Sequence, residues 1–593
     1  MQTKNFDKAD YILLVSVLLC TILTGGFTWY SCIIPCFLLI IYLIIKRGNS
    51  LTWQSTILAT MIAIGLVSII CSKGDKQNAL YEFEKYFCLI LSIYAGCKCN
   101  NKQVIRNLII VAAALVSIVG LLAYCNIIKS SGLVFYDRKI IRLQSFIQYA
   151  NTTSILLACG YFLTLNNCKK NNVMICISQC ILLSFYLTVS KGGIALYLLL
   201  GTGLIFVKKE YAERFVLQNF TSLIFFLALV ITAANRLHAF SFILISVCII
   251  AGYHIAKLKM NKKTLIILWM SCLISGVIAV VILIKTTNIN LFSTFEKRIE
   301  YMVDACKLIK NNLLLGVGPG AWKYYQYSVQ TTQYDVRYIH NGWLQFLVEN
   351  GIFFVLMLIT ISIPSIKKLI KNKNYDFLAC AMLIALHALI DFDLSFGVVL
   401  MLFGLIIGGE ISTENNKISF KTINILIISI AILTTFYMSV EYFVRNSFER
   451  NYLNKKYDAA LCSARTLEKI CPYDSNLQLS IAALDNTTAK ECIEKARALS
   501  PLDPYLLEKC INYYIYNGGE NVLDLVKEYI ELMPKQEITY TNAYEFLKRI
   551  WEKGECSEED YNNMKEYVER RQAKEQVIDR NRSLKSTVIN DSG

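Results

Sequence analysis

Long apolar runs alternate with short polar turns over the first three quarters of this chain. About fifteen of these runs approach the roughly 20 residues that an α-helix needs to cross a lipid bilayer. They are expected at residues 11–28, 30–45, 55–72, 81–97, 104–128, 147–166, 173–189, 193–207, 218–234, 238–256, 264–285, 342–363, 376–391, 396–410 and 422–443. The pattern predicts an all-α fold, with a polytopic membrane bundle of about 12–15 helices in residues 1–443.

Lysine and arginine cluster in alternate turns between these runs. The turns "KRGNS", "KCNNKQVIR", "NNCKKNN", "KKEYAER", "KLKMNKK" and "KKLIKNKN" are all basic, whereas short turns on the other side, such as "DFDLS", are poor in lysine and arginine. Because short basic loops stay in the cytoplasm, the N-terminus is expected inside. By the same count the long loop 286–341 and everything after residue 444 are expected outside the cytoplasm.

Composition supports a membrane protein and does not support a nucleic-acid-binding protein. Hydrophobic residues make up 55% of the 593 residues and charged residues only 18%, which is more apolar surface than a soluble core of this size would bury. The net charge of +16 follows partly from the basic cytoplasmic turns, so it does not indicate nucleic acid binding. The 21 cysteines show no paired spacing, and most are expected to act as small apolar side chains.

The chain becomes charged and amphipathic after Phe443. Pro472, Pro501 and Pro534 each follow a helical pattern and lie 29 and 33 residues apart. A repeat of about this length predicts stacked helical hairpins of the tetratricopeptide type in residues 444–572. The polar segment 573–593 is expected to be disordered.

Cations occur at two positions where the charge pattern disfavours them. Arg142 lies in the outward-facing segment 137–153 and could offer a planar pair of donors to a phosphate. The alternative is that such cations extend from the interface toward lipid headgroups. Lys191 lies in the outer turn "SKGG", where a helix begins and an anion is favoured, although a plain connecting loop explains this turn equally well.

The loop 286–341 contains the richest set of candidate residues. Its amphipathic helix carries Arg298, and the glycine turn "LLLGVGPGAW" includes Gly316 and Gly318. These glycines do not indicate a nucleotide site, since no strand precedes them and no Gly-Lys-Ser/Thr follows. The next apolar run starts with a group of polar residues at its outer end: His340, Asn341, Gln345 and Glu349. Polar groups in spans usually face the bundle interior and mark function, but some of these could serve only in helix packing.

A fourth candidate group lies in "LHALIDFDLSFG". His387 and Asp391 are four residues apart, which places them on one face of a helix. The two side chains could satisfy each other inside the bundle. Alternatively, Asp391 and Asp393 could form a carboxylate pair for a divalent cation.

Several of these motifs together resemble the O-antigen ligase and polysaccharide polymerase superfamily. They are "RLQSFIQYANTT", "SKGG", Arg298 upstream of "LLLGVGPGAW", "IHNGWLQFLVENG" and "HALIDFDLS", within residues 130–410. The tail is similar to that of several members, including relatives of protein O-oligosaccharyltransferases. The resemblance implies a multi-pass glycosyltransferase of the bacterial cytoplasmic membrane. It would use glycans carried on undecaprenyl diphosphate at the outer face, without a metal or other cofactor.

The resemblance also implies roles for individual residues. His340 matches the histidine thought to act as general base, and Arg298 matches the arginine expected to hold the donor diphosphate. Arg142 matches an arginine before the sixth span. Lys191 replaces an arginine of many members, which keeps the charge but removes bidentate geometry. The remaining expected substrate-binding residues are Gly316, Gly318, Asn341, Gln345, Glu349, His387 and Asp391.

The sequence does not identify the acceptor of the glycan. A cell-surface polysaccharide is the first expectation, and a protein acceptor of the same superfamily chemistry is the alternative, with the tail as a possible site for an acceptor or a partner protein. A transporter of the lipid-linked glycan is the rival from another class. Such a transporter would carry polar groups near the middle of the membrane, whereas here they gather at the outer ends of the spans.

Overall fold

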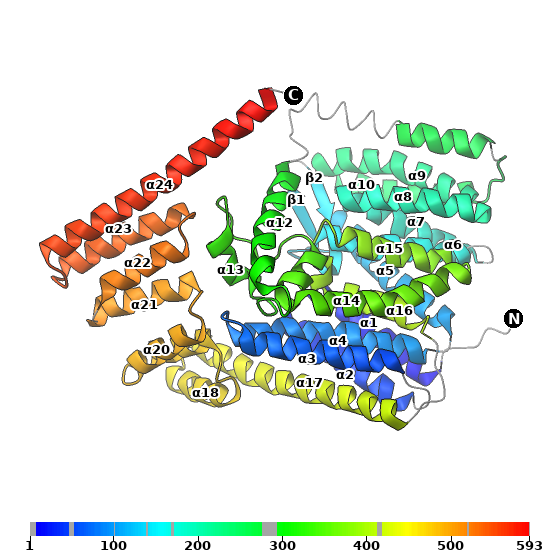
Figure 1. The fold of residues 1–593 in the computed structure, drawn as a ribbon. Helices are drawn as coiled ribbons and strands as arrows, with labels where there is room; N and C mark the ends of the chain where they lie inside the picture. Colours follow the sequence, from blue (N-terminus) through cyan, green and yellow to red (C-terminus); the bar gives the residue numbers. More distant parts are fainter. Residues whose placement is uncertain are drawn as a thin grey trace.

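The computed structural model confirms that the chain is an all-α protein (Figure 1). It describes residues 7–46, 52–99, 101–137, 140–167, 171–261, 263–274, 293–411, 418–518 and 521–591. Within these residues, strands occur only in a two-stranded antiparallel sheet, β1 (Val134–Asp137) and β2 (Ile140–Leu143). The span expected at 264–285 and the loop expected from 286 both extend into residues outside this described part.

A bundle of apolar helices forms the larger part of the molecule. A helix over Lys263–Ile274 lies between α10 and α12 in the chain. The other bundle helices are α1 (Lys8–Ile22), α2 (Trp29–Ile45), α3 (Trp53–Cys71), α4 (Lys76–Lys98), α5 (Lys102–Tyr124), α6 (Ala150–Asn167), α7 (Asn172–Leu187), α8 (Lys191–Val207), α9 (Lys209–Ala234), α10 (His238–Ile255), α14 (Gly342–Lys371), α15 (Tyr375–His387), α16 (Gly397–Gly408) and α17 (Ile418–Leu453).

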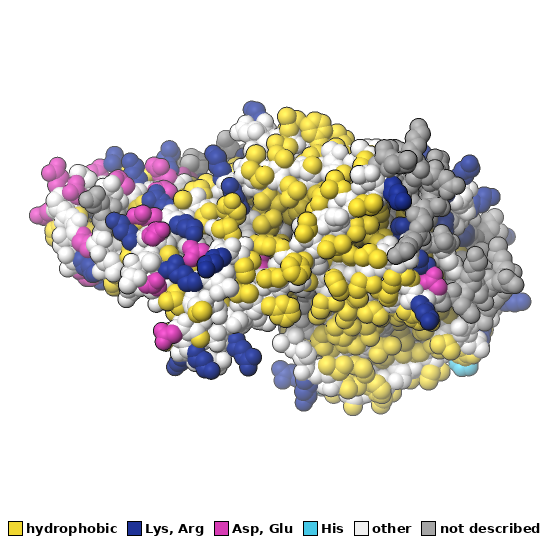
Figure 2. All heavy atoms as spheres, turned by 90° about the horizontal axis from the view of Figure 1, so that it is seen from below, with side chains coloured by type: hydrophobic (Ala, Val, Ile, Leu, Met, Phe, Trp, Pro, Cys, Tyr) yellow, Lys and Arg dark blue, Asp and Glu magenta, His cyan; other side chains and the backbone are white. Residues whose placement is uncertain are grey.

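The surface of this bundle is the surface of a membrane protein. Among the described residues, 6 helices are long and apolar enough to cross a bilayer, and further apolar helices are shorter. Hydrophobic side chains cover the middle of the molecule in Figure 2, while charged side chains gather on the C-terminal part. Large apolar side chains that point outward include Phe37, Ile70, Leu199, Phe206, Leu227, Leu433 and Phe436. An outward apolar belt is stable only in contact with lipid.

The two ends of the bundle are formed by different turns and loops. At one end the basic turns meet: Lys98 Nζ donates to the carbonyl of Lys46 at 2.8 Å, and Lys102 pairs with Glu410. The opposite end carries the β-sheet, α12 (Ser293–Asn312) and α13 (Trp322–Val329). We refer to these as the basic end and the loop end.

The C-terminal part is a series of helices that each pack on the next in the chain. They are α18 (Tyr457–Ile470), α19 (Ser475–Leu484), α20 (Ala489–Leu499), α21 (Pro504–Asn517), α22 (Val522–Leu532), α23 (Glu537–Glu552) and α24 (Glu558–Asp591). Sequential packing of this kind is typical of helical repeats, and the tetratricopeptide assignment stays a prediction. The boundary expected at residue 443 falls inside α17, which continues beyond the bundle to Leu453.

Helix α24 extends into the segment 573–593, for which the sequence predicts disorder, and it ends at Asp591. The segment is rich in Glu, Arg, Gln, Lys and Ala, which have high intrinsic helix propensity. Its disorder stays a prediction.

The C-terminal helices lie beyond the loop end of the bundle, next to α12 and α13 (Figure 1). Tyr505 donates a hydrogen bond to Asp335 at 2.7 Å, and Gln536 donates to the carbonyl of Tyr334 at 2.6 Å. Both acceptors belong to the loop that leads to His340. The C-terminal domain is therefore attached to the same end of the bundle as the candidate site.

Candidate active site

Five separate segments of the chain converge on the turn between α15 and α16 at the loop end. They are β2, the start of α6, the start of α8, the helix α12 and the residues just before α14. The turn begins where α15 ends at His387 and includes the short 3-10 helix Asp393–Ser395. Two aspartates of this turn, Asp391 and Asp393, are both fully buried and organise two neighbouring hydrogen-bond networks.

Asp391 is the centre of the first network. Its carboxylate accepts hydrogen bonds from the Tyr149 hydroxyl at 3.0 and 3.1 Å, from Asn151 Nδ2 at 2.6 Å and from the backbone N–H of Phe392 at 2.9 Å. Tyr149 directly precedes α6, and Asn151 lies in its first turn. A buried carboxylate with this many donors is held in one orientation, so Asp391 can orient other groups in turn.

The groups around Asp391 keep its carboxyl group ionised. Burial alone would raise the pKa of this carboxyl group, but the hydrogen bond with His340 and the positive charge of Arg298 outweigh burial. The pKa of Asp391 therefore lies below its usual range, and the group is an anion at neutral pH.

His340 contacts Asp391 from the other side. Its Nδ1 lies 3.2 Å from Asp391 Oδ1, and its ring meets the edge of Phe392 with ring centres 4.8 Å apart. When Nδ1–H donates to the carboxylate, Nε2 has a free lone pair and can accept a proton. About a fifth of the side chain, 22%, is exposed. The histidine is thus both oriented by a carboxylate and accessible.

The backbone of His340 is in the left-handed region, with φ at +58°. This conformation is uncommon for residues with a Cβ atom and is often found at functional sites. Two neighbours fix it: the N–H of Ile339 donates to Gln345 Oε1 at 2.8 Å, and Asn341 caps α14 by accepting from the N–H of Leu344 at 2.9 Å.

Arg298 reaches the same carboxylate from α12. Its Nη1 donates to the carbonyl of Ile390 at 2.7 Å, and its Nη2 lies 3.3 Å from Asp391 Oδ2. The side chain is 22% exposed. A guanidinium group has five N–H donors in a planar fork, so Arg298 is fixed by its contacts with the turn while it brings positive charge to an open site.

Arg142 and Lys191 are the two other cations that the sequence singles out. Arg142 in β2 donates from Nη2 to Asn151 Oδ1 at 2.8 Å and from Nε to the carbonyl of Thr188 at 3.0 Å. It therefore supports the amide that donates to Asp391. Lys191 is exposed and is the first residue of α8, which Ser190 caps by accepting from the N–H of Gly193 at 3.3 Å. Both cations are at the loop end.

The pairing expected between His387 and Asp391 is wrong. His387 is buried, and its Nδ1 is hydrogen-bonded to Asp393 instead; Asp393 also accepts from Thr152 at 2.7 Å. The helical spacing that motivated the expectation ends at His387, where α15 stops. A Cβ atom on Gly192 would lie 3.3 Å from His387 Nε2, so the start of α8 packs directly on this histidine.

The alternative prediction is that Asp391 and Asp393 bind a divalent cation together. The structure places the two carboxylates in different hydrogen-bond networks. Protein donors already surround both carboxylates. Across the described part of the chain, no group of three or more His, Cys, Asp or Glu side chains is placed to hold a metal ion. The arrangement around Asp391 is therefore that of an anion paired with one protein cation, Arg298, and hydrogen-bonded to neutral donors.

Gly316 and Gly318 form a tight turn against α14 and lie outside the group around Asp391. Both have positive φ angles, +70° and +106°. The N–H of Gly318 donates to the carbonyl of Glu349 at 2.9 Å, and a Cβ on Gly316 would lie 2.4 Å from the backbone of Glu349. Only glycine fits this turn without strain.

Gln345 and Glu349 are buried and connect this turn to His340. Gln345 Nε2 donates to Glu349 Oε1 at 2.6 Å, while Gln345 Oε1 accepts from the N–H of Ile339. These two side chains thus hold the backbone that precedes the histidine. Substrate contact by either remains a prediction from the resemblance.

Sequence reasoning missed a buried lysine beside the site. Lys85 in α4 is only 2% exposed and pairs with Glu82. Its Nζ donates to the Tyr338 hydroxyl at 3.1 Å and to the carbonyl of Ser395 at 3.3 Å, and the Tyr338 ring stacks on Phe392 at 5.1 Å. The signal was present in the sequence: a span that contains Glu82 and Lys85 must satisfy both charges inside the bundle.

The fold and this site define a polytopic membrane protein with a histidine, a buried carboxylate and an arginine gathered at one end of an apolar bundle. The family model described as O-antigen ligase matches residues 174–359. The matched segment includes Lys191, Arg298 and His340. Over this segment the match supports the predicted resemblance to the O-antigen ligase superfamily. No curated protein matches the chain.

Proposed function

We propose that this protein transfers or polymerises a glycan from an undecaprenyl-diphosphate-linked donor onto an acceptor hydroxyl, at the extracytoplasmic face of the bacterial cytoplasmic membrane. One observation carries the proposal: His340 and Arg298 contact opposite oxygens of the same buried carboxylate, Asp391. A base and a fixed cation are thereby brought to one point at the end of a membrane bundle.

His340 is the proposed general base. Asp391 accepts the Nδ1 hydrogen bond and leaves Nε2 to take the proton of the acceptor hydroxyl. As the proton leaves, the hydroxyl oxygen forms a bond to the anomeric carbon of the donor, and the bond from that carbon to the diphosphate oxygen breaks. Base assistance of this kind typically contributes about 10²–10⁴-fold to the rate. A single displacement inverts the anomeric configuration.

Arg298 is the proposed partner of the leaving diphosphate. A diphosphate is already a good leaving group, so the chief requirement is stabilisation of the charge that develops on its oxygens. Arg298 is fixed by Ile390 and Asp391 before the donor arrives, so little reorganisation is needed. The exposed Lys191 adds a second positive charge at the same end.

The acceptor is proposed to be a cell-surface polysaccharide. The C-terminal helices support a role in acceptor or partner binding, because they are hydrogen-bonded to the loop that precedes His340. Bringing the acceptor to this domain would place it at the loop end, where the reaction is proposed to occur.

The test is transfer by the purified full-length protein in liposomes that contain a synthetic undecaprenyl-diphosphate oligosaccharide. The proposal predicts longer glycan products and release of undecaprenyl diphosphate, with equal rates in the presence and absence of a chelator. Movement of intact donor across the membrane, with no new glycosidic bond, would show a transporter instead. Labelling of the exposed Cys462 in intact cells by a membrane-impermeant maleimide tests the proposed orientation.

A further inference from the structure

Lys85 joins the two segments of the chain whose side chains meet at the candidate active site. Its Nζ donates to the Tyr338 hydroxyl at 3.1 Å and to the carbonyl of Ser395 at 3.3 Å. Tyr338 lies two residues before His340, and Ser395 lies four residues after Asp391. One ammonium group therefore bonds both to the segment that carries the histidine and to the turn that carries the carboxylate.

The other contacts of Lys85 fix the position of its ammonium group. Glu82 forms an ion pair with it, and Nζ also donates to the carbonyl of Phe27 at 3.2 Å. The Tyr338 hydroxyl in turn donates to the Glu82 carboxylate, with oxygen–oxygen distances of 3.2 and 3.3 Å. An ammonium group has only three N–H donors, so its four acceptors leave it no capacity to bind a further ligand.

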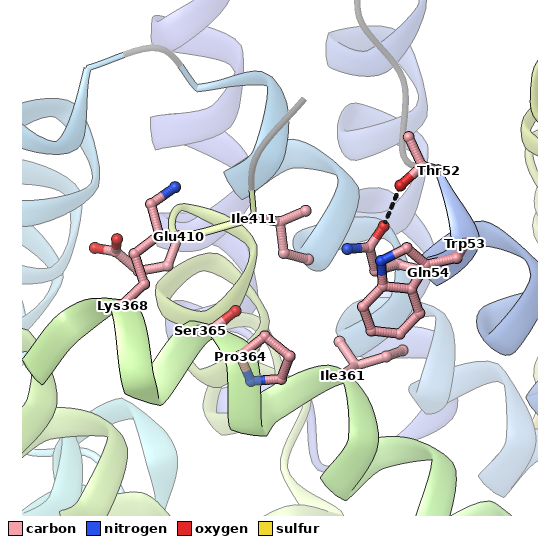
Figure 3. Close-up of a pocket in the computed structure, with 9 residues that line it drawn as sticks. All are labelled: Thr52, Trp53, Gln54, Ile361, Pro364, Ser365, Lys368, Glu410 and Ile411. Carbon is pink, nitrogen blue, oxygen red and sulfur yellow. Dashed lines mark hydrogen bonds between the residues drawn. The ribbon is translucent and has the colours of Figure 1, made fainter. Parts of the chain in front are cut away.

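Lys85 is also closed to a substrate. Its side chain is only 2% exposed, and the half-exposed Arg337 pairs with the same Glu82 carboxylate at 2.7 Å. A cavity of about 310 Å³ lies at the basic end, between the start of α3, the last turns of α14 and the residues that follow α16 (Figure 3). None of the described residues that line it belongs to the network around Lys85. Lys85 can therefore affect a reaction only through the residues that it holds.

The contacts of Tyr338 connect this network to His340. The Tyr338 ring stacks on Phe392 with ring centres 5.1 Å apart, and Phe392 meets the His340 ring at 4.8 Å. A buried ion pair is often no more stabilising than apolar side chains of the same volume, but apolar side chains cannot direct hydrogen bonds. The directed bonds of Lys85 hold Tyr338 against Phe392, and Phe392 holds the histidine ring.

We propose that Lys85 is a positioning residue that keeps His340 in hydrogen-bonding contact with Asp391. This inference rests on the proposed function of these two residues. With Lys85 in place, the proton on His340 Nδ1 stays on the side of the carboxylate, and Nε2 is left unprotonated. Without Lys85, the ring is released to the other neutral tautomer, in which Nε2 carries the proton and cannot act as a base.

The experiment combines NMR of the full-length protein, labelled with nitrogen isotope in its histidines, with the transfer assay. The chain has only 4 histidines, and the spectrum of His340→Gln identifies the signals of His340. The chemical shift of a ring nitrogen shows whether it carries a proton, so the spectrum reports the tautomer without any turnover. In alkaline buffer, where the ring is neutral, the natural protein is expected to show His340 protonated at Nδ1 alone.

Two variants break the network to different extents. Lys85→Met combined with Glu82→Gln removes both charges, so that no buried charge is left unpaired. Tyr338→Phe removes one hydroxyl, and it decides the question if the double variant fails to fold. Each variant should show both tautomers of His340. Each should also lower the turnover number at least about tenfold, the effect of one hydrogen bond to a charged group, with an unchanged KM for the donor.

The matched control is Tyr86→Phe on the same helix. The Tyr86 hydroxyl accepts from Asn350 Nδ2 at 3.0 Å, so this variant loses a buried hydrogen bond that does not involve Lys85. It should keep the natural tautomer and turnover. Both tautomers of His340 in the natural protein, or the Nδ1-protonated form alone in Tyr338→Phe, would overturn the proposal. Absence of transfer by the natural protein would contradict the proposed function, whereas the tautomer of His340 still decides whether Lys85 positions the ring.

Discussion

Replacing Asp391 with asparagine tests the proposed role of the buried carboxylate. The substitution preserves size but removes the charge, and one of the two oxygen positions becomes an NH₂ group. If that group replaces Oδ1, it faces the N–H of Phe392; if it replaces Oδ2, it faces Arg298 and Asn151. Either orientation sets donors against donors, so the network cannot be kept intact.

The expected loss of turnover follows from the role of the Asp391 hydrogen bond in orienting His340. Each hydrogen bond to a charged group contributes about 1.5–3 kcal/mol, so loss of the Asp391 bond releases the histidine ring from its orientation. The largest loss of turnover that can arise through His340 is the whole contribution of the general base, about 10²–10⁴-fold. We expect Asp391→Asn to lower the turnover number by at least about 10²-fold.

The assay is the single-turnover rate of glycan transfer by full-length protein in liposomes. If Asp391 acts through His340, the double variant with His340→Ala will be little slower than His340→Ala alone, because residues that act as a unit are not additive. Asp376→Asn controls for the loss of a buried charge, since Asp376 pairs with Arg106 in the first turn of α15, away from the loop end. Turnover within twofold of the natural protein for Asp391→Asn, or full additivity with His340→Ala, would refute the reasoning.

Three further predictions follow from the structure. Arg298→Lys keeps the charge but cannot bond both Ile390 and Asp391, so the KM for the donor should rise about tenfold, as for a lost charged hydrogen bond; an unchanged KM argues against diphosphate binding. Gly318→Ala places a Cβ 2.6 Å from Ser72 at a φ of +106° and should cost about 1–3 kcal/mol of stability, measured by thermal unfolding; an unchanged melting temperature contradicts the turn geometry. Burial opposes ionisation of Glu468, but hydrogen bonds from Lys495, Gln478 and Arg465 lower its pKa from 4.5 to about 2. The stability that ionised Glu468 contributes to the fold is therefore complete above the unfolded-state pKa and is lost between about pH 4.5 and 2. As the pH falls through this range, the melting temperature of Glu468→Gln should approach that of the natural protein. A constant difference between the two melting temperatures contradicts the pairing.

The bundle could be predicted from the sequence because its signal is local. Apolar runs of bilayer length and basic turns between them are read directly along the chain, and the structure brings several of these basic turns together at one end of the bundle. The β-sheet was missed because each strand has only 4 residues, too few for a periodic pattern. The state of the tail is not determined by its polar composition, which disordered segments and solvated helices share.

The candidate site was predicted in part, and the missing part depends on packing between distant segments. His340, Arg298 and Asp391 were each singled out, but their meeting at one carboxylate joins residues from three separate helix ends. The pairing of His387 was wrong because a helix period was extended past the end of α15. Lys85 is on α4, far from the motifs in sequence, and only the fold brings it beside Tyr338.

The most direct measurement compares the natural protein with His340→Ala in donor binding and in the rate of transfer, using the same preparation of full-length protein and synthetic donor. A general base is needed for proton transfer and not for holding the diphosphate. We expect His340→Ala to lower the turnover number about 10²–10⁴-fold and to change donor affinity by less than about threefold. Transfer by His340→Ala at the natural rate, or loss of donor binding as large as the loss of turnover, would contradict it.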